Sequence, residues 1–304
     1  MMKFEGIAAF VAVAEAGSIS EAARRLGLPK SVVSERLAEL ERALGAQLIQ
    51  RTTRKLTITL DGTAFLERGR RMMQEMVSAT AEMAERRGAL VGPLRISAPV
   101  TFGVLHLGPA LCAFLGEHPG IDLSLELDDR FVDLAADGYD AAIRHGHVRD
   151  ARLVAKRLAP SRRALVASPD YLAKRGTPRS LAELEKHEAL LYSFRQADWR
   201  FQAGGRWIVM RPKPGLRVNN GLILREAALA GLGITLLPTF VIANELASGA
   251  LQRVDVGVEP EGAELHIAYS SERVASAKLR ALTQYLRRKF GDPPYWDVVA
   301  KASR

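Results

Sequence analysis

The sequence predicts a fold of the mixed α+β and α/β classes: a compact helical unit, then one long helix, then a larger two-lobed α/β domain. Three observations support this prediction. Apolar residues recur at helical spacing as far as Leu44, a single long helical pattern follows Gly62, and strand-like and helix-like segments alternate after Pro93. A chain of 304 residues exceeds what one hydrophobic core usually supports, so we expect two or three domains.

The first segment is predicted to contain a helix-turn-helix. Apolar residues within Ile7–Ala14 form one face of a first helix. A second helix begins at Ser18 or Ser20, either of which can cap it, and stops at Gly27. A third helix begins near Ser31 after a tight turn, and two helices joined in this way form a helix-turn-helix.

A β-hairpin and a long helix are expected next. Leu56–Leu60 alternates with period 2, as a half-buried strand does, whereas Leu48–Ile49 is too short for periodicity to decide. The long helix follows Asp61-Gly62 and runs to about Arg87. It carries a heptad-like apolar seam, interpreted as a dimer-forming surface, which consists of Phe65, Met72, Met76, Ala79 and Met83.

The composition is that of an ordinary globular protein, with 48% hydrophobic and 25% charged residues. The net charge of +9 favours a polyanionic partner, but residues 1–62 hold little of the excess, so bulk charge alone does not indicate DNA. Cys112 is the only cysteine, and we expect it to be buried and not to sense redox state. No signal peptide or transmembrane run is recognised, so we expect a cytoplasmic location and no membrane contact.

The predicted third helix presents short polar and basic side chains suited to the major groove, and the hairpin presents basic ones suited to phosphates. The alternative is a solvated charged surface, which the clustering around a helix-turn-helix disfavours. For Arg24 and Arg25, backbone contact and idle surface are equally open. We expect DNA contacts from Ser18, Ser20, Lys30, Ser31, Ser34, Arg36, Arg51, Thr52, Thr53 and Arg54.

The alternation of strands and helices after Pro93 predicts parallel sheets in two lobes, with a ligand crevice between them. Two helix starts, near Thr101 and after Asn219-Asn220, favour an anionic ligand, although Thr101 and Asn219 can also serve only as caps. Arg144 suits a ligand carboxylate or a salt bridge within one lobe. The candidate effector-binding residues are Ser97, Thr101, Phe102, Phe131, Arg144, Asn219 and Asn220.

Other polar clusters are not expected to bind ligands. His145 and His147 alternate in a loop without a third ligand nearby, so we expect neither a metal nor a cofactor. The basic residues within Arg149–Arg163 are interpreted as a solvated surface, with subunit contact or non-specific DNA attraction as the alternatives. The tail beyond Pro293 is predicted to be peripheral.

Both halves of the chain resemble the LysR-type transcriptional regulators. In the first half, the resembling segments are Ala14–Leu26, Ser31–Ser34, Leu40-Glu41 and Leu44–Arg54. In the second half, they are Tyr139–Arg144, Ala167–Leu172, Gly176–Pro178, Leu181 and His187. Both halves in this order, from about Phe4 to about Phe290, are more specific than a helix-turn-helix alone.

The resemblance implies a winged helix-turn-helix at residues 1–62, a linker and dimerisation helix at 63–88, and a two-lobed, periplasmic-binding-protein-like effector domain at 92–304. Lobe I would comprise about 92–162 and 267–292, and lobe II about 163–266. It also implies a homotetramer, built as a dimer of dimers, that binds an interrupted palindrome in double-stranded promoter DNA. Two positions depart from the family: Glu35 stands where relatives often carry a basic or amide residue, and Thr59-Leu60-Asp61-Gly62 lacks the usual acidic residue after the threonine.

The leading hypothesis is a DNA-binding transcription regulator whose promoter binding is modulated by a small anionic effector, such as a carboxylate. The alternative is a ligand-independent repressor or architectural protein whose sensor lobes serve only oligomerisation. An enzyme is not expected, because the sequence has no P-loop, no Gly-x-Ser-x-Gly elbow and no His-Glu-x-x-His motif. A transport-type binding protein would explain the two lobes but not the N-terminal DNA-reading unit.

Overall fold

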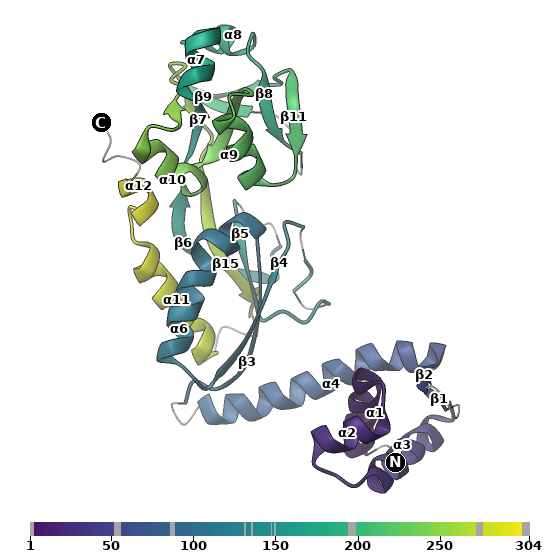
Figure 1. Ribbon diagram of the computed structural model, residues 1–304. Coiled ribbons are helices and arrows are strands. Elements are labelled where there is room, and N and C mark those ends of the chain that lie inside the picture. The colour runs from purple at the N-terminus through teal and green to yellow at the C-terminus, as the bar shows by residue number, and fades with distance from the viewer. Residues whose placement is uncertain are drawn as a thin grey trace. The chain divides into compact units, whose positions relative to one another are not determined.

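The computed structural model describes residues 3–51, 56–85, 89–130, 132–134, 136–146, 148, 150–193, 199–271 and 276–299. It divides into two compact units, Met1–Gly92 and Pro93–Arg304, shown as ribbons in Figure 1. The N-terminal unit contains α1 (Phe4–Ala16), α2 (Ile19–Leu26), α3 (Lys30–Leu44), β1 (Ile49–Arg51), β2 (Leu56–Ile58) and α4 (Leu60–Glu85).

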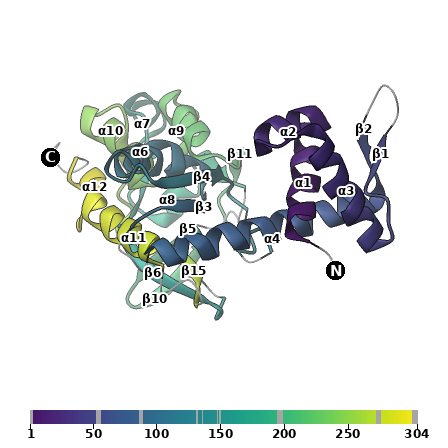
Figure 2. The ribbon, with the colours of Figure 1, turned by 90° about the horizontal axis from the view of Figure 1, so that it is seen from below.

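Helices α1, α2 and α3 of the N-terminal unit pack around one small apolar core. Phe10, Val33 and Leu37 are completely buried in it, so the apolar stripes of α1 and α3 face each other. Gly27 ends α2 with a φ of 64°, a conformation that favours glycine, and this permits the sharp turn into α3. The helix-turn-helix predicted from the sequence is therefore present, and β1 and β2 form an antiparallel wing beyond α3 (Figure 2).

Thr59 and Gly62 join the wing to the long helix. The Thr59 hydroxyl donates to the Gln47 carbonyl at 2.7 Å and accepts from the Gly62 N–H at 2.9 Å. A Cβ atom on Gly62 would lie 2.1 Å from the Leu48 carbonyl oxygen, so no other residue fits there without displacing the backbone. Helix α4 begins at Leu60, slightly earlier than the Asp61-Gly62 start predicted from the sequence.

The seam predicted on α4 divides into two parts. Phe65 does not belong to it: its ring centroid lies 5.7 Å from that of Phe10, and it packs against the core of the helix-turn-helix. Further along α4, Met72, Met76 and Met83 have exposed fractions of 43%, 52% and 61%. The exposed apolar surface therefore begins one or two turns after the predicted first member.

Lobe I of the C-terminal unit is built on a five-stranded sheet in the order β4-β3-β5-β15-β6. Its strands are β3 (Gly92–Ala98), β4 (Ile121–Leu127), β5 (Ala141–His145), β6 (Leu153–Ser161) and β15 (Ala263–Ser270). Its helices are α5 (Val100–Phe102), the π-helical η1 (Gly103–Leu107), α6 (Gly108–Glu117) and α11 (Ala277–Phe290). In Figure 1, α6 and α11 run side by side along this sheet, and the rings of Phe114 and Tyr285 join them at 5.3 Å.

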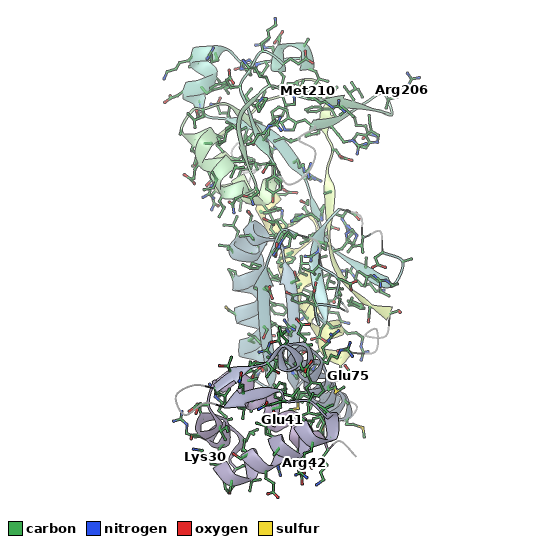
Figure 3. All side chains as sticks on the ribbon, turned by 90° about the vertical axis from the view of Figure 1, so that its right-hand side faces the viewer. Lys30, Glu41, Arg42, Glu75, Arg206 and Met210 are labelled. Carbon is green, nitrogen blue, oxygen red and sulfur yellow. The ribbon has the colours of Figure 1, made fainter. Side chains whose placement is uncertain are left out.

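Lobe II contains a five-stranded sheet, β11-β8-β12-β7-β13, and a three-stranded sheet, β10-β9-β14. The strands are β7 (Arg163–Ala167), β8 (Ala189–Tyr192), β9 (Trp199–Ala203), β10 (Arg206–Met210), β11 (Pro214–Val218), β12 (Ile234–Pro238), β13 (Gln252–Arg253) and β14 (Glu259–Pro260). The helices are α7 (Pro169–Arg175), α8 (Leu181–Leu184), α9 (Gly221–Leu229) and α10 (Thr239–Ser248). Hairpin β9–β10 projects from the lobe, with Arg206 at its free end and Met210 at its base (Figure 3).

The sheets are mixed, which corrects the expectation of parallel sheets. Strands β3 and β5 are parallel, as are β8, β11 and β12, but β15 runs antiparallel to β5 and β6, and β7 runs antiparallel to β12. The chain passes from lobe I to lobe II between β6 and β7. It returns to lobe I in β15, which runs antiparallel to β6. Strand β15 already pairs with Ser161 of β6 at Ala263, so the second crossing precedes the predicted position at 267.

Residues Val100–Glu117 form one continuous apolar helical stretch through α5, η1 and α6. By length and composition alone this stretch is long enough to cross a membrane, but 44% of it is buried inside the protein. Phe102, Leu107 and Phe114 are completely buried within it. The stretch is therefore a core helix of lobe I, and it also supplies the candidate ligand-binding residues Thr101 and Phe102.

Candidate DNA interface and effector site

The start of α3 presents the predicted DNA-reading side chains to solvent. Lys30 and Ser31 are exposed and Ser34 is half-buried, whereas Val33 and Leu37 point into the core. Lys30 and Arg42 mark the two ends of this helix in Figure 3. A solvent-facing helix start with free backbone N–H groups and short polar side chains suits the major groove and its flanking phosphates.

Arg36 does not share the outer face of α3. At about 100° per residue, it lies about 160° around the helix from Ser34. It is half-buried, and a Cβ atom on Gly6 of α1 would lie 3.2 Å from its carbonyl oxygen. Arg42 is exposed on the outer face instead, and sequence reasoning did not select it. The helical spacing of α3 was the sequence feature that could have placed Arg42 on this face.

Glu41 ties the end of α3 to the base of the wing. Its Oε1 accepts hydrogen bonds from the N–H groups of Leu48 at 2.8 Å and Ile49 at 3.0 Å. Both of these apolar residues are only 1% exposed, so the carboxylate satisfies backbone donors at a buried strand start. Of the predicted wing contacts, Thr52, Thr53, Arg54 and the Arg51 side chain lie outside the described residues.

The serines and arginines of α2 have defined local roles. The Ser18 hydroxyl caps α2 by accepting from the Glu21 N–H at 3.5 Å, and Ser20 is exposed. Glu21 forms ion pairs with Arg24 and Arg25, and the hydrogen bonds from these guanidinium groups hold its pKa below the ordinary value. The positive charge of both arginines is therefore partly neutralised. Both side chains lie on the exposed surface of α2, within the helix-turn-helix.

In the C-terminal unit, the starts of α5 and α9 approach each other across the two lobes. A Cβ atom on Gly221, the first residue of α9, would lie 3.4 Å from the Thr101 hydroxyl oxygen. Thr101 is 9% exposed and Ser97, at the end of β3, is completely buried. The predicted effector residues of both lobes are thus brought close together.

Side chains of the protein itself already occupy both helix starts. The Val100 N–H of α5 donates to Asp129 Oδ1 at 3.1 Å. The Leu222 and Ile223 N–H groups of α9 donate to Asn220 Oδ1 at 2.9 and 3.3 Å, while Asn219 is exposed. The cap of α9 is therefore Asn220, whereas the capping alternative had named Asn219 and Thr101. Asp129 was missed, although an acidic pair directly after β4 could have indicated a capping role.

Arg144 at the end of β5 is a half-buried cation with neutral hydrogen-bond partners. Its guanidinium donates to the Ile143 carbonyl at 2.8 Å and to the Ser97 hydroxyl at 3.3 Å. Burial lowers the pKa of Arg144, which Asp128 and Asp129 oppose through their charge. In the part of the chain that the structure describes, no carboxylate forms an ion pair with this guanidinium, so the alternative of a lobe-internal salt bridge is not seen.

Phe102 does not line an open crevice, which corrects its assignment as a ligand-contacting wall. It is completely buried, and its ring lies 5.3–6.0 Å from the rings of Phe240, Phe290 and Trp296. Phe102 follows Thr101 in the helix and therefore points about 100° away from it, a direction that here leads into the core. The other proposed wall, Phe131, lies outside the described residues.

His106 joins the two lobes in this aromatic cluster. Its Nε2 lies 2.9 Å from the Phe240 carbonyl oxygen of α10, so Nε2 carries the proton and donates. Its Nδ1 then accepts from the hydroxyl of Tyr295 in α12 (Tyr295–Val299). Burial lowers the pKa of His106, although the bond to the carbonyl raises it. The imidazole is therefore held neutral.

The C-terminal tail is not peripheral, contrary to the sequence-based expectation. Trp296 is 1% exposed and Asp297 is 3% exposed. Asp297 Oδ1 accepts from the Thr239 hydroxyl at the start of α10, and Oδ2 lies 3.7 Å from Arg162 Nε. Helix α12 thus contacts lobe II, while α11 before it belongs to lobe I. In the sequence, the large apolar side chain of Trp296 was the feature that could have indicated a buried tail.

Two arginines of lobe I form ion pairs with neighbouring carboxylates. Arg152 pairs with Asp150 at 2.7 Å, and Arg157 pairs with Glu264 and Asp292, both at 2.9 Å. Among the described residues no metal-binding cluster is found. Cys112 is exposed on α6, where it had been expected to be buried.

A winged helix-turn-helix combined with a two-lobed α/β domain defines the class of ligand-responsive bacterial transcription regulators. The family model described as bacterial regulatory helix-turn-helix protein, lysR family, matches residues 4–63. The model of the LysR substrate binding domain matches residues 87–291. The chain belongs to the LysR family of transcriptional regulators; it is a DNA-binding regulator with an effector-binding domain and not an enzyme.

Named relatives agree over nearly the full length. The transcriptional regulator PtxR of Pseudomonas aeruginosa is 35% identical, over 94% of this chain and 93% of that protein. The solved structure of CrgA from Neisseria meningitidis has 32% identity and a TM-score of 0.62, covering 94% of this chain and 98% of that one. Full-length AphB of Vibrio cholerae has 27% identity and the same TM-score and coverages.

Proposed function

We propose that the chain is a cytoplasmic, effector-gated regulator in which α3 and the wing bind promoter DNA and Arg144 binds the carboxylate of a small effector. The single observation that supports the ligand class is the Arg144 guanidinium, which is half-buried at the end of β5 and bonded only to a hydroxyl and a carbonyl in the described contacts. A buried cation gains most from a charged, bidentate partner.

The N-termini of α5 and α9 support an anionic ligand less strongly than the sequence predicted. Asp129 already places a negative charge at the start of α5, and Asn220 already satisfies the first donors of α9. In this proposal the ligand carboxylate lies beside Arg144 and Ser97, and Thr101 of α5, which faces Gly221 of α9, lies close by. Ser97 and Thr101 remain candidate contacts of such a ligand.

DNA recognition is proposed to involve Ser18, Ser20, Lys30, Ser31, Ser34 and the wing residues Arg51, Thr52, Thr53 and Arg54. Arg36 lies beside α1, on a different side of α3 from Ser34. We therefore assign it a phosphate contact and not a contact with the bases that Ser34 would read. Helix α4 is proposed to pair with α4 of a second copy along its exposed methionines, and two such dimers would read an interrupted palindrome.

The test is a thermal-shift screen of small aromatic and aliphatic carboxylates, each beside its neutral amide. A ligand at about a hundred times its dissociation constant stabilises the folded state by about 2.7 kcal/mol. We expect a carboxylate to raise the melting temperature of the wild type, its amide to fail, and Arg144→Gln to abolish the shift. Arg175→Gln, at an exposed position on α7, is the matched control and should respond like the wild type. A shift that persists in Arg144→Gln would contradict the assignment of Arg144.

One observation favours a second function, the ligand-independent repressor. Both helix starts at the lobe junction are satisfied by Asp129 and Asn220, so the protein needs no ligand to complete its hydrogen bonds there. A complete absence of shifts in the screen, together with unaltered DNA binding, would support this second function.

A further inference from the structure

Glu35 lies on the outer face of α3, in the part of the helix that would enter the major groove. It follows the buried Val33 by two residues, so it points about 160° away from the core. It is exposed, and Ser31 lies four residues earlier on the same face. The DNA-facing side of α3 therefore presents a carboxylate next to the predicted serine contact.

The other two carboxylates of α3, and Glu15 of α1 and Glu21 of α2, have partners. Their partners are Lys3 for Glu39 at 3.1 Å, the backbone of Leu48 and Ile49 for Glu41, Arg24 and Arg25 for Glu21, and Arg70 for Glu15 at 2.8 Å. Glu35 forms no hydrogen bond or ion pair with any residue that the structure describes. Its negative charge is uncompensated on a surface that must approach phosphates.

A carboxylate in the major groove is selective because it can only accept hydrogen bonds. Guanine and thymine present acceptors there, and adenine places its N7 acceptor beside its amino donor. Cytosine presents its N4 amino group without an adjacent acceptor. We propose that Glu35 is a specificity-determining residue that accepts a hydrogen bond from a cytosine amino group and disfavours guanine and thymine at that position. This inference depends on the proposed reading of DNA by α3.

The charge also bears on non-specific binding. Like charges repel each other even in water, and salt screens the repulsion. Glu35 therefore weakens attachment to DNA that offers no amino group opposite it. The residue would increase discrimination and decrease general affinity.

The experiment selects binding sites from a random pool of DNA duplexes with the full-length wild type, Glu35→Gln and Glu39→Gln. Glu39→Gln is the matched control, because it removes a carboxylate on the same helix that is paired with Lys3. We expect the wild type and Glu39→Gln to select cytosine at one position of each half-site. Glu35→Gln should lose about tenfold of that preference and gain affinity for adenine, which an amide can bind through two hydrogen bonds.

A second readout is the affinity for a random-sequence duplex, measured by fluorescence anisotropy at low salt. Glu35→Gln should bind this duplex about two- to fivefold more tightly than the wild type, and the difference should shrink as salt is added. Because Glu35 is exposed, thermal unfolding of this variant should match the wild type, and Glu35→Asp offers a second variant that keeps the charge.

Two results would overturn the inference, and they have different meanings. If Glu35→Gln selects the same bases as the wild type, α3 reads DNA but Glu35 does not determine the base. If neither the wild type nor Glu39→Gln enriches any sequence, the proposed reading of DNA by α3 is itself wrong.

Discussion

The imidazole of His106 connects three separate parts of the chain through its two nitrogens. One nitrogen donates to the carbonyl of Phe240 in lobe II, and the other accepts from Tyr295 in the tail. The ring itself packs against Phe102 and Trp296, with centroid distances of 5.6 and 4.7 Å. Such an arrangement requires the neutral imidazole, because burial disfavours the charged form.

Stability should therefore depend on pH through His106. The pKa of His106 in the folded protein is lowered from the ordinary 6.5. As the pH falls, the unfolded chain therefore binds a proton at this histidine before the folded chain does. The stabilisation is fully present above pH of about 6.5 and is lost as the pH falls below that value. Urea unfolding between about pH 7.5 and 5 should show a steeper loss of free energy for the wild type than for His106→Gln. Equal slopes would show that the histidine is not held neutral.

Contacts of two single residues, Asp129 and Phe102, explain why the sequence alone misjudged the candidate ligand site. The sequence suggested two free helix starts, but Asp129 occupies one of them from a loop about thirty positions away. Phe102 was proposed as a ligand contact beside Thr101, yet its side chain points about 100° away from that residue and is buried in the core. Both misassignments follow from tertiary contacts, because neither helical period nor composition states which distant side chain fills a position.

At the scale of elements, α12 is too short to be stable alone and gains its stability from burial. Only Tyr295–Val299 are helical, but Trp296 fits into the aromatic cluster between α5, η1 and α10. Isolated helices of this length are unstable in water, so the tertiary contact must fix the segment. The tail should therefore contribute to the stability of both lobes.

Replacement of Trp296 by alanine tests this role. Removing a large buried aromatic side chain costs about 3–5 kcal/mol, through lost burial and an unfilled cavity. Urea unfolding should show this loss for Trp296→Ala, while Val298→Ala, at a 55% exposed position of the same helix, should change stability by about 0.5 kcal/mol or less. A loss for Trp296→Ala as small as that of the control would mean that the tail is peripheral after all.

Helix α4 has an element-scale property of the opposite kind: it keeps apolar side chains in solvent. Met76 and Val77 have exposed fractions of 52% and 48%, and both line a shallow apolar groove with Phe4, Met73 and Ala81. Exposed apolar surface of this kind is typical of an interaction site. The proposed occupant is the same helix of a second copy.

Sedimentation equilibrium tests that proposal. Met76→Glu should shift the protein toward monomers, because it would bury an unpaired carboxylate in each α4 pair. Glu75→Gln, at the neighbouring exposed position labelled in Figure 3, should leave the mass distribution of the wild type unchanged. An unchanged distribution for Met76→Glu would place the subunit contact elsewhere.

Elements with strong periodicity were predictable from sequence, and short ones were not. Clear apolar patterns are seen in α1, α2, α3, α4, α9 and α11. The hairpin β9–β10 was missed, because Trp207, Ile208 and Val209 are consecutive apolar residues without period 2, and all three are at least 40% exposed. The π-helical turn at Gly103–Leu107 leaves no mark in the sequence pattern, since it only shifts the hydrogen-bond spacing.

For the whole molecule, the charge of +9 does not by itself locate the DNA-binding surface. Arg152 and Arg157 of the C-terminal unit are engaged in ion pairs with that unit's own carboxylates. The assignment depends instead on where α3 presents its side chains and on the family to which the chain belongs. Gating further requires that the effector bind two arrangements of the molecule with different affinities.

The most direct measurement is a fluorescence-anisotropy titration of a selected duplex with the wild type and Arg144→Gln, each with and without the carboxylate found in the screen. Without ligand, both proteins should bind the duplex equally, because Arg144 belongs to the C-terminal unit. With ligand, only the wild type should change its affinity, by about 5- to 150-fold if the coupling is of ordinary size. An Arg144→Gln protein that fails to bind DNA without ligand, or that still responds to the ligand, would contradict the division into a DNA-reading unit and an effector-binding unit.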